Sequence, residues 1–295
     1  MDSDWTKHIY QFDVIFVRHA ESYNNTLYQE IRDDLGECSD AVFSLEETKR
    51  RQSDSTLSKR GFEQVMKLRS FLKRGGWSGI IKNKRRWVAL SSPMKRCLLT
   101  ADAVHNDVGI PVTVDPTLYE TGGAYDANGA ALPGVSEADI VRDYPGYSCK
   151  PGMENGFFAN RSHKETDPEF DERAFGIANM IWSACCDSVQ ARKSGATDSL
   201  EGMVIVAHGN LLSAVINCLL TQSKTPRTGL FVHENSGFSH IELHYDAMRG
   251  RKAIAMKQLN EYSHLAAQTD SETQENPMRC GNHTTDDHWI QEFLV

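Results

Sequence analysis

The stretch Val14-Ile15-Phe16-Val17-Arg18-His19-Ala20-Glu21-Ser22 decides how this chain folds. Its first half is a short apolar run with β-branched residues, which is typical of a strand buried in a sheet. The run ends abruptly in Arg18 and His19, and polar residues follow. Open α/β sheets bind ligands in the crevice outside the carboxyl ends of their parallel strands. The stretch therefore predicts a guanidinium and an imidazole at the ligand-binding edge of such a sheet.

Two further apolar runs end in the same way. Residues 203–207 lead into His208-Gly209-Asn210, and residues 87–90 lead through Ser91-Ser92-Pro93 to a helix-like stretch with Arg96. A histidine that faces a core needs hydrogen-bond partners, so packing alone does not explain two buried strands that end in histidine. Arginine holds phosphate in a bidentate fork, and histidine can act as a nucleophile or carry protons near neutral pH. The runs together predict phosphoryl chemistry on histidine.

The remaining pattern predicts an α/β protein. We expect strands at residues 12–17, 87–90, 111–114 and 203–207, a closing antiparallel pair at 237–243 and 253–259, and helices at 58–74, 93–107, 136–144, 167–192 and 211–220. Ser136 should cap the short helix at 136–144, and Asp167 should cap the long helix with Pro168 at its first position. Residues 1–265 then form one catalytic domain, with insertions near 26–53 and 121–166. The polar tail at 266–295 is either a docking segment or a frayed end.

Five short elements resemble branch 1 of the histidine phosphatase superfamily, which includes the cofactor-dependent phosphoglycerate mutases. In chain order they are Arg18-His19-Ala20-Glu21-Ser22 with Asn25; Asp54, Leu57, Ser58, Gly61 and Gln64; Ser92-Pro93 with Arg96 and Thr100-Ala101; Leu118-Tyr119-Glu120; and Ala207-His208-Gly209-Asn210. The resemblance spans roughly residues 12–265. It implies a three-layer α/β/α sandwich with a mostly parallel central sheet. Ala20 stands where the family usually has glycine, so we expect either a negative φ there or a loop slightly further from the phosphate.

The resemblance also implies catalytic roles. His19 would attack phosphorus and become a phosphohistidine, while a backbone carbonyl or similar acceptor holds the proton on its other ring nitrogen. Arg18 and Arg96 would neutralise the phosphate oxygens, and His208 would donate a further hydrogen bond. Glu120 would protonate the leaving oxygen and then accept a proton from water. These groups would need no metal or other cofactor.

Other site residues carry alternatives. Ser22, Asn25 and the Gly209 amide could complete the phosphate cradle, although Ser22 and Asn25 could instead serve only as helix-capping groups. Glu137 and Glu154 lie in the same insertion as Glu120 and could replace it as the acid.

The resemblance leaves the reaction open, and the residues favour hydrolysis. Thr26-Leu27-Tyr28-Gln29 and a long insertion follow Asn25, and the Arg-Arg-Ser-Phe run of mutases is missing. The aromatic-bearing insertion after Glu120 looks like that of phosphatase members. We therefore expect a phosphomonoester hydrolase that acts on a small phosphorylated substrate. A phosphoglycerate mutase and a non-catalytic protein that binds a phosphate ligand are the alternatives.

The composition limits the partners and the cellular location that we expect for this protein. The 295 residues carry a net charge of −8, which argues against nucleic-acid or anionic-membrane partners. No apolar run approaches the ~20 residues of a membrane span, and the N-terminus lacks a signal-peptide core. We therefore expect a cytoplasmic protein with reduced thiols. Whether the protein forms a homodimer is left open by the sequence. His240 and His244 are expected to be structural or exposed rather than metal ligands. Zinc at Cys280, His283 and His288 is not expected, because these residues sit alone in a polar tail.

Overall fold

A seven-stranded mixed sheet forms the centre of the computed structural model, which describes residues 9–224 and 229–266. The strand order is β4-β3-β2-β5-β1-β6-β7. The first five strands of the chain run parallel to one another, and β6 and β7 close one edge as an antiparallel pair. The strands are β1 (Ile9–Arg18), β2 (Trp87–Ser91), β3 (Val112–Val114), β4 (Ser148–Cys149), β5 (Gly202–Ala207), β6 (Phe238–Asp246) and β7 (Arg251–Glu261).

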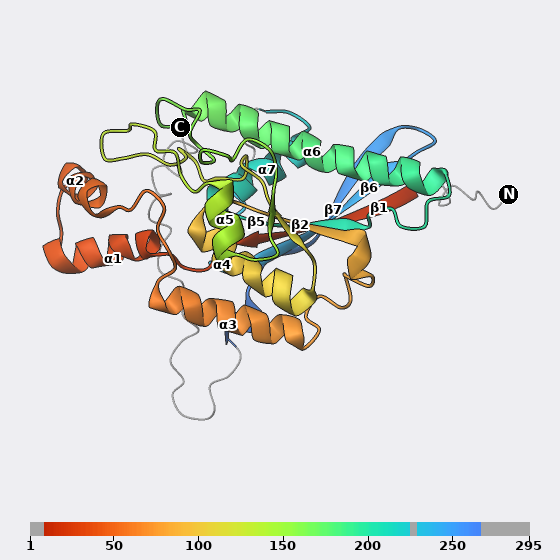
Figure 1. Ribbon diagram of the computed structural model, residues 1–295, viewed down its shortest axis with the longest axis horizontal. Helices are drawn as coiled ribbons and strands as arrows, with labels where there is room; N and C mark the ends of the chain where they lie inside the picture. Colours follow the sequence, from red (N-terminus) through yellow and green to blue (C-terminus); the bar gives the residue numbers. More distant parts are fainter. Residues whose placement is uncertain (1–8, 225–228, 267–295) are drawn as a thin grey trace.

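Helices cover both faces of this sheet, as Figure 1 shows. One layer holds α6 (Asp167–Lys193) and α7 (Gly209–Thr221), and the other holds α3 (Lys59–Lys73), α4 (Lys95–Ala103) and α5 (Glu137–Asp143). Strand β1 supplies both cores, because successive side chains point to opposite faces. Ile15 and Val17 pack in the core with α3 and α4, whereas Val14 and Phe16 pack with α6 and α7. The chain thus has the predicted three-layer α/β/α architecture.

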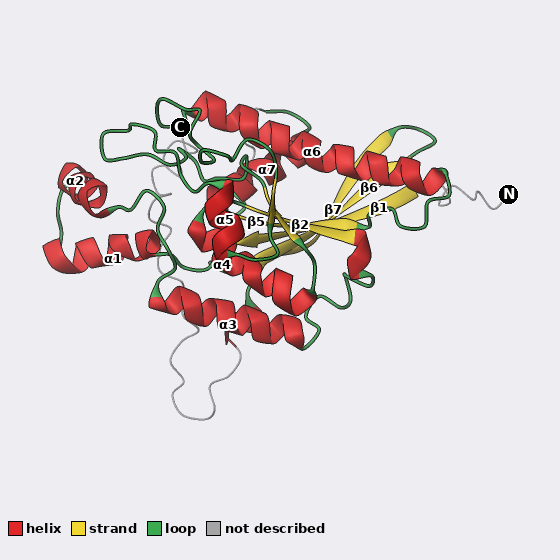
Figure 2. Cartoon of the chain, in the orientation of Figure 1, coloured by secondary structure: helices red, strands yellow, loops and turns green. Residues whose placement is uncertain are grey.

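The insertion after β1 forms two helices that extend beyond the carboxyl ends of the parallel strands (Figure 1). These are α1 (Tyr23–Leu35) and α2 (Asp40–Arg50). They bury a small cluster of their own, formed by Leu27, Ile31 and Phe43. The second insertion is mostly loop, as Figure 2 shows, and contains α5 and the short strand β4. Both insertions therefore lie where they can shape the access to the sheet edge.

Three details differ from the expectation. Strand β4 was not predicted, because two residues are too few to show a hydrophobic period. The helix expected from residue 93 begins at Lys95 and continues in a π-helical turn at Val104–Val108. The N-cap of α6 is Thr166 and not Asp167, since the Thr166 amide and hydroxyl both donate to the Glu169 carboxylate at 2.8 Å. The Ser136 cap is confirmed, because its hydroxyl accepts the Asp139 amide.

Three further expectations concern the C-terminal tail, the cysteines and membrane spans. Residues 267–295 of the predicted tail, with Cys280, His283 and His288, lie outside the described residues. The six cysteines within the described ranges are free thiols. In the same ranges, no helix is long and apolar enough to cross a bilayer.

Candidate active site

The sheet topology brings the predicted site residues together. Strands β2, β5 and β1 are neighbours, so their carboxyl ends deliver Arg96, His208 and His19 to one place. A cavity of about 910 Å³ opens there. The predicted residues that line it are Arg18, His19, Ser22, Asn25, Arg96, Glu120 and Gly209. His208 is fully buried beside this lining and contacts it through Arg96 and Glu120.

His19 is held as a neutral imidazole with a defined tautomer. Its Nδ1 lies 2.7 Å from the Ala20 carbonyl oxygen, and the Arg96 Nε–H donates to its Nε2 at 3.2 Å. An N–H donor on Nε2 requires a lone pair there, so the ring proton is on Nδ1 and the carbonyl accepts it. Burial lowers the pKa of His19 well below its usual value, and the charges of Arg96 and Arg18 lower it further. The expected backbone acceptor is therefore present, and Nε2 carries the ring lone pair.

Arg96 contacts the second histidine as well. Its terminal nitrogen donates to His208 Nδ1 at 3.1 Å, and the two imidazole rings lie 5.1 Å apart. His208 Nε2 is 2.8 Å from the Ser92 hydroxyl. Burial lowers the pKa of His208 well below its usual value, with further contributions from Arg96 and His19, so this imidazole is also neutral. The proton of His208 is on Nε2, because Nδ1 accepts from Arg96.

The Ser92 hydroxyl gives His208 a choice of tautomer. A hydroxyl can donate or accept, so it can pair with Nε2 in either protonation state. When a phosphate oxygen takes the place of the Arg96 N–H at Nδ1, the imidazole must carry its proton on Nδ1 to donate to it. Ser92 then donates to Nε2 instead of accepting from it. Ser92 belongs to one of the five motif elements, but the family resemblance implied no role for it.

Glu120 is the glutamate of its insertion that lines the cavity. Its Oε2 lies 3.9 Å from His208 Nδ1, and its Oε1 accepts the Thr121 amide at 2.9 Å. The side chain is 19% exposed, so it can exchange protons with solvent. Glu137 and Glu154 do not line the cavity. The position of Glu120 supports it as the general acid over both alternatives.

Arg18 is fixed by the loop that precedes β6. Its terminal nitrogen donates to the His233 carbonyl oxygen at 2.5 Å, and its Nε is buried without a hydrogen-bond partner among the described residues. Gly209 lies beside it, because a Cβ at that position would be 3.5 Å from the Arg18 Nε. A buried N–H without a partner costs free energy, and a phosphate oxygen at the sheet edge would satisfy it.

Other motif residues hold the catalytic loop and do not line the cavity. The Thr100 hydroxyl accepts the Ala20 amide at 3.0 Å, and the Gln64 side chain accepts the Glu21 amide at 2.7 Å. Gly61 packs so closely that a Cβ there would lie 1.9 Å from the Glu21 carbonyl oxygen. Ala20 is fully buried, and its φ is not positive, so the loop accepts alanine without strain. This turn agrees with the first of the two conformations expected for Ala20.

The loop before β6 supports the site, and its contribution was not predicted. The Asn235 amide and the Ser236 backbone N–H both donate to the His19 carbonyl oxygen, at 3.1 and 3.2 Å. Ser236 has a φ of 63°, which bends the loop toward β1. An irregular loop gives no hydrophobic period, so no sequence pattern identified this support.

Ser22 and Asn25 belong both to the cavity lining and to a helix cap. Ser22 is the N-cap of α1, and the Asn25 carbonyl oxygen accepts from the Ser22 amide at 3.0 Å and from its hydroxyl at 2.9 Å. The capping role is thus present, and phosphate binding by these two side chains remains a prediction.

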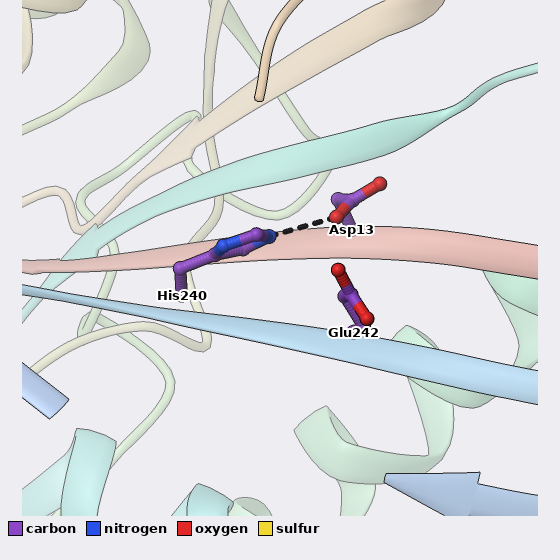
Figure 3. A group of neighbouring side chains, drawn as sticks. All are labelled: Asp13, His240 and Glu242. Atoms are coloured by element: carbon purple, nitrogen blue, oxygen red, sulfur yellow. Dashed lines mark hydrogen bonds and ion pairs between the residues drawn. The ribbon is translucent and has the colours of Figure 1, made fainter. Parts of the chain in front are cut away.

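A second group of titratable residues lies on the sheet away from the cavity (Figure 3). Asp13, His240 and Glu242 place ligand-type atoms within 4.8 Å of one another. The His240 ring points at Asp13 and pairs with it at 2.7 Å, and Lys257 lies 3.4 Å from the Glu242 carboxylate. His244 also pairs with Glu242, at 3.2 Å. Because the described members already have partners, we interpret the group as a hydrogen-bonded network, as expected for structural histidines.

Comparison with known proteins gives the family. Residues 14–255 match the model of the histidine phosphatase superfamily (branch 1), so the chain belongs to that superfamily. Among solved structures, a mycobacterial glucosyl-3-phosphoglycerate phosphatase is 17% identical with a TM-score of 0.47, over 85% of this chain and 99% of that one. The α-ribazole phosphatase from Shigella flexneri is 18% identical with a TM-score of 0.44, over 85% and 97%. At these values the two structures carry no argument about the substrate here. No curated protein matches this chain.

Proposed function

We propose that this protein is a phosphatase that hydrolyses phosphomonoesters through a phosphohistidine on His19. The observation that carries the proposal is the neutral imidazole of His19, whose Nδ1–H donates to the Ala20 carbonyl oxygen and whose Nε2 lone pair lies at the cavity. A buried, oriented and uncharged imidazole is the form that can attack phosphorus. Arg18, Arg96, His208 and Glu120 supply the remaining functions.

In the first step the Nε2 lone pair of His19 forms a bond to phosphorus, and the bond from phosphorus to the ester oxygen breaks. Glu120 in its acid form donates its proton to that oxygen, so the product leaves as a neutral alcohol. Arg18 and Arg96 balance the charge on the phosphoryl oxygens, and His208 donates to one of them from Nδ1. The Nδ1 proton of His19 stays on Nδ1 throughout, where it is donated to the Ala20 carbonyl oxygen.

In the second step water replaces the alcohol. Glu120, now a carboxylate, accepts a proton from water as the water oxygen bonds to phosphorus. The phosphorus–nitrogen bond breaks and returns its electron pair to Nε2, which releases inorganic phosphate. The cavity of about 910 Å³ is much larger than one phosphoryl group, so it leaves room for that water. This room supports hydrolysis over a mutase reaction, in which the enzyme must keep its phosphoryl group from water.

The test is phosphate release from a panel of phosphomonoesters, measured for the intact protein and for His19→Ala. Turnover should vanish in His19→Ala and persist in His244→Ala, a control that removes an imidazole from β6 outside the cavity. Rapid quenching in base should trap phosphate on the intact protein and not on His19→Ala. A protein that releases no phosphate but isomerises 3-phosphoglycerate would be a mutase, and one that does neither but binds phosphate would be a binding protein.

A further inference from the structure

The two insertions each place a cation beside one aromatic ring in the cavity. The Arg51 guanidinium carbon lies 5.4 Å from the centre of the Tyr125 ring, and Lys164 Nζ lies 4.7 Å from it. All three residues line the cavity that holds His19. Arg51 follows α2 of the first insertion, whereas Tyr125 and Lys164 belong to the second. Segments far apart in the sequence thus converge on one point of the cavity.

The backbone of the second insertion fixes this arrangement. The Lys164 amide donates to the Gly129 carbonyl at 3.0 Å. The Glu165 amide donates to the Gly122 carbonyl at 3.0 Å, and the Gly122 amide donates to the Glu165 carboxylate at 3.3 Å. A Cβ on Gly122 would lie 2.9 Å from both Tyr125 Cε1 and Lys164 Cε. Glycine at that position therefore allows the lysine stem and the tyrosine ring to pack together.

The positive charges of Arg51 and Lys164 have few nearby ion-pair partners among the described residues. Lys164 forms no ion pair with any residue in the described ranges, and Arg51 has one long pair, 3.7 Å to Glu47. Asp126 also lines the cavity, where its Oδ1 accepts the amides of Asn128 and Ala130, and among the described residues it forms no ion pair with Arg51 or Lys164. Two cations near one ring repel each other, and a ring at an exposed site attracts each of them only weakly. An anion between them would remove this repulsion.

We propose that Arg51 and Lys164 form a second anion subsite, and that the substrate is a phosphomonoester with a second anionic group. The proposal rests on the proposed function, since the first phosphoryl group must lie at His19. The second group is a phosphate or a carboxylate, because both accept from guanidinium and ammonium donors. The cavity volume, which far exceeds a single phosphate, accommodates such an extended molecule.

The test compares matched ester series. The series are α,ω-alkanediol bisphosphates, ω-phosphooxy carboxylates and the corresponding alkanediol monophosphates, each with two to six methylene groups. At the best chain length the intact protein should show kcat/KM about 10-fold higher for a dianionic ester than for the neutral-ended one. The stronger of the bisphosphate and carboxylate series identifies the second group. The preference should shrink as salt is raised, because both cations are partly exposed.

Variants assign the effect to the two cations. The double variant Arg51→Gln/Lys164→Gln should reduce the ratio to about 1 while leaving kcat/KM for the neutral-ended esters unchanged, which also shows that the variant folds. The control Lys193→Gln, at the exposed end of α6, should keep the full ratio. Equal rates for both ester classes in the intact protein, or an unchanged ratio in the double variant, would overturn the subsite and leave the phosphatase standing. If no ester is hydrolysed, the proposed function fails. Calorimetry with an alkane bisphosphonate and a monophosphonate then decides the subsite, because equal affinities would refute it.

Discussion

Replacing Ser92 by alanine tests the hydrogen-bond argument at His208. The Ser92 side chain is fully buried, and its hydroxyl is 2.8 Å from His208 Nε2. The hydroxyl accepts from Nε2 in the arrangement described above, and in the proposed phosphoryl transfer it would donate to Nε2 so that Nδ1 could carry the proton. Ser92→Ala removes both possibilities. The Cys97 sulfur, 3.5 Å from Nε2, is then the nearest remaining partner, and sulfur is a weak one.

The size of the effect follows from these contacts. Ser92→Ala leaves two buried N–H groups without this partner, His208 Nε2–H and the Met94 amide, and each costs about 1–3 kcal/mol of folding stability. Complete loss of one donor to the transition state costs about 10²–10³ in kcat. His208 itself stays in place in the variant and Cys97 still contacts it, so we expect a smaller loss, about 10–50-fold in kcat. KM should change less than about threefold, because His208 has to donate mainly where charge builds in the transition state.

The assay measures kcat and KM for one phosphomonoester, together with the free energy of unfolding in urea. Ser91→Ala is the matched control, since Ser91 is also fully buried but its hydroxyl donates to the Ser92 carbonyl and not to a histidine. Both variants should lose stability, and only Ser92→Ala should lose kcat by more than about threefold. Equal kcat values for the two variants would refute the tautomer argument, because a merely structural hydroxyl would affect both alike.

Three further outcomes follow from the structure. Glu120→Gln should slow hydrolysis of alkyl phosphates by about 10²–10⁴-fold and hydrolysis of p-nitrophenyl phosphate far less, because a good leaving group needs no acid; equal losses would remove Glu120 from that role. Gly61→Ala should lower the unfolding free energy by about 3 kcal/mol, since its Cβ would meet a backbone carbonyl at 1.9 Å, whereas Gly176→Ala, with nothing within 4 Å, should be neutral or stabilising. The lowered pKa values of His19 and His208 mean that the unfolded chain binds protons first as pH falls below about 6.5, so unfolding free energy should decrease from that pH downward, while kcat/KM should show no loss from His19 protonation near 6.5.

The sequence allowed the fold to be predicted where its hydrophobic period was strong. Strand β1 gave a clear signal because both of its faces are buried, and it ends at Arg18, next to the proposed nucleophile His19. Strand β4 gave no such signal, because its two residues are too few to show a hydrophobic period. It is recognised only by its pairing with Thr113 and Val114 of β3. The cap of α6 was misplaced by one residue because threonine and aspartate are both good caps, and only the reciprocal bonds with Glu169 distinguish them.

The sequence also predicted only part of the candidate site. Residues at strand ends were predictable, because the topology of a parallel sheet collects its carboxyl ends at one edge. The supports from Asn235 and the His233 carbonyl were not predictable, because they come from an irregular loop and one of them is a backbone atom. The convergence of Arg51 and Lys164 depends on how two insertions fold against each other, and neither insertion shows this in its own sequence.

Arg96 contacts both imidazoles of the candidate site, and these contacts bear on the proposed reaction. Its guanidinium donates to lone pairs of both rings, including Nε2 of His19, the proposed nucleophile. A phosphate dianion accepts from a guanidinium more strongly than a neutral imidazole does, because both partners are then charged. In the proposed mechanism, a bound phosphoryl group would therefore compete with both rings for Arg96. Loss of these two bonds would free the lone pair of His19 and let His208 act as a donor, so the nucleophile would be released when there is a phosphoryl group to attack.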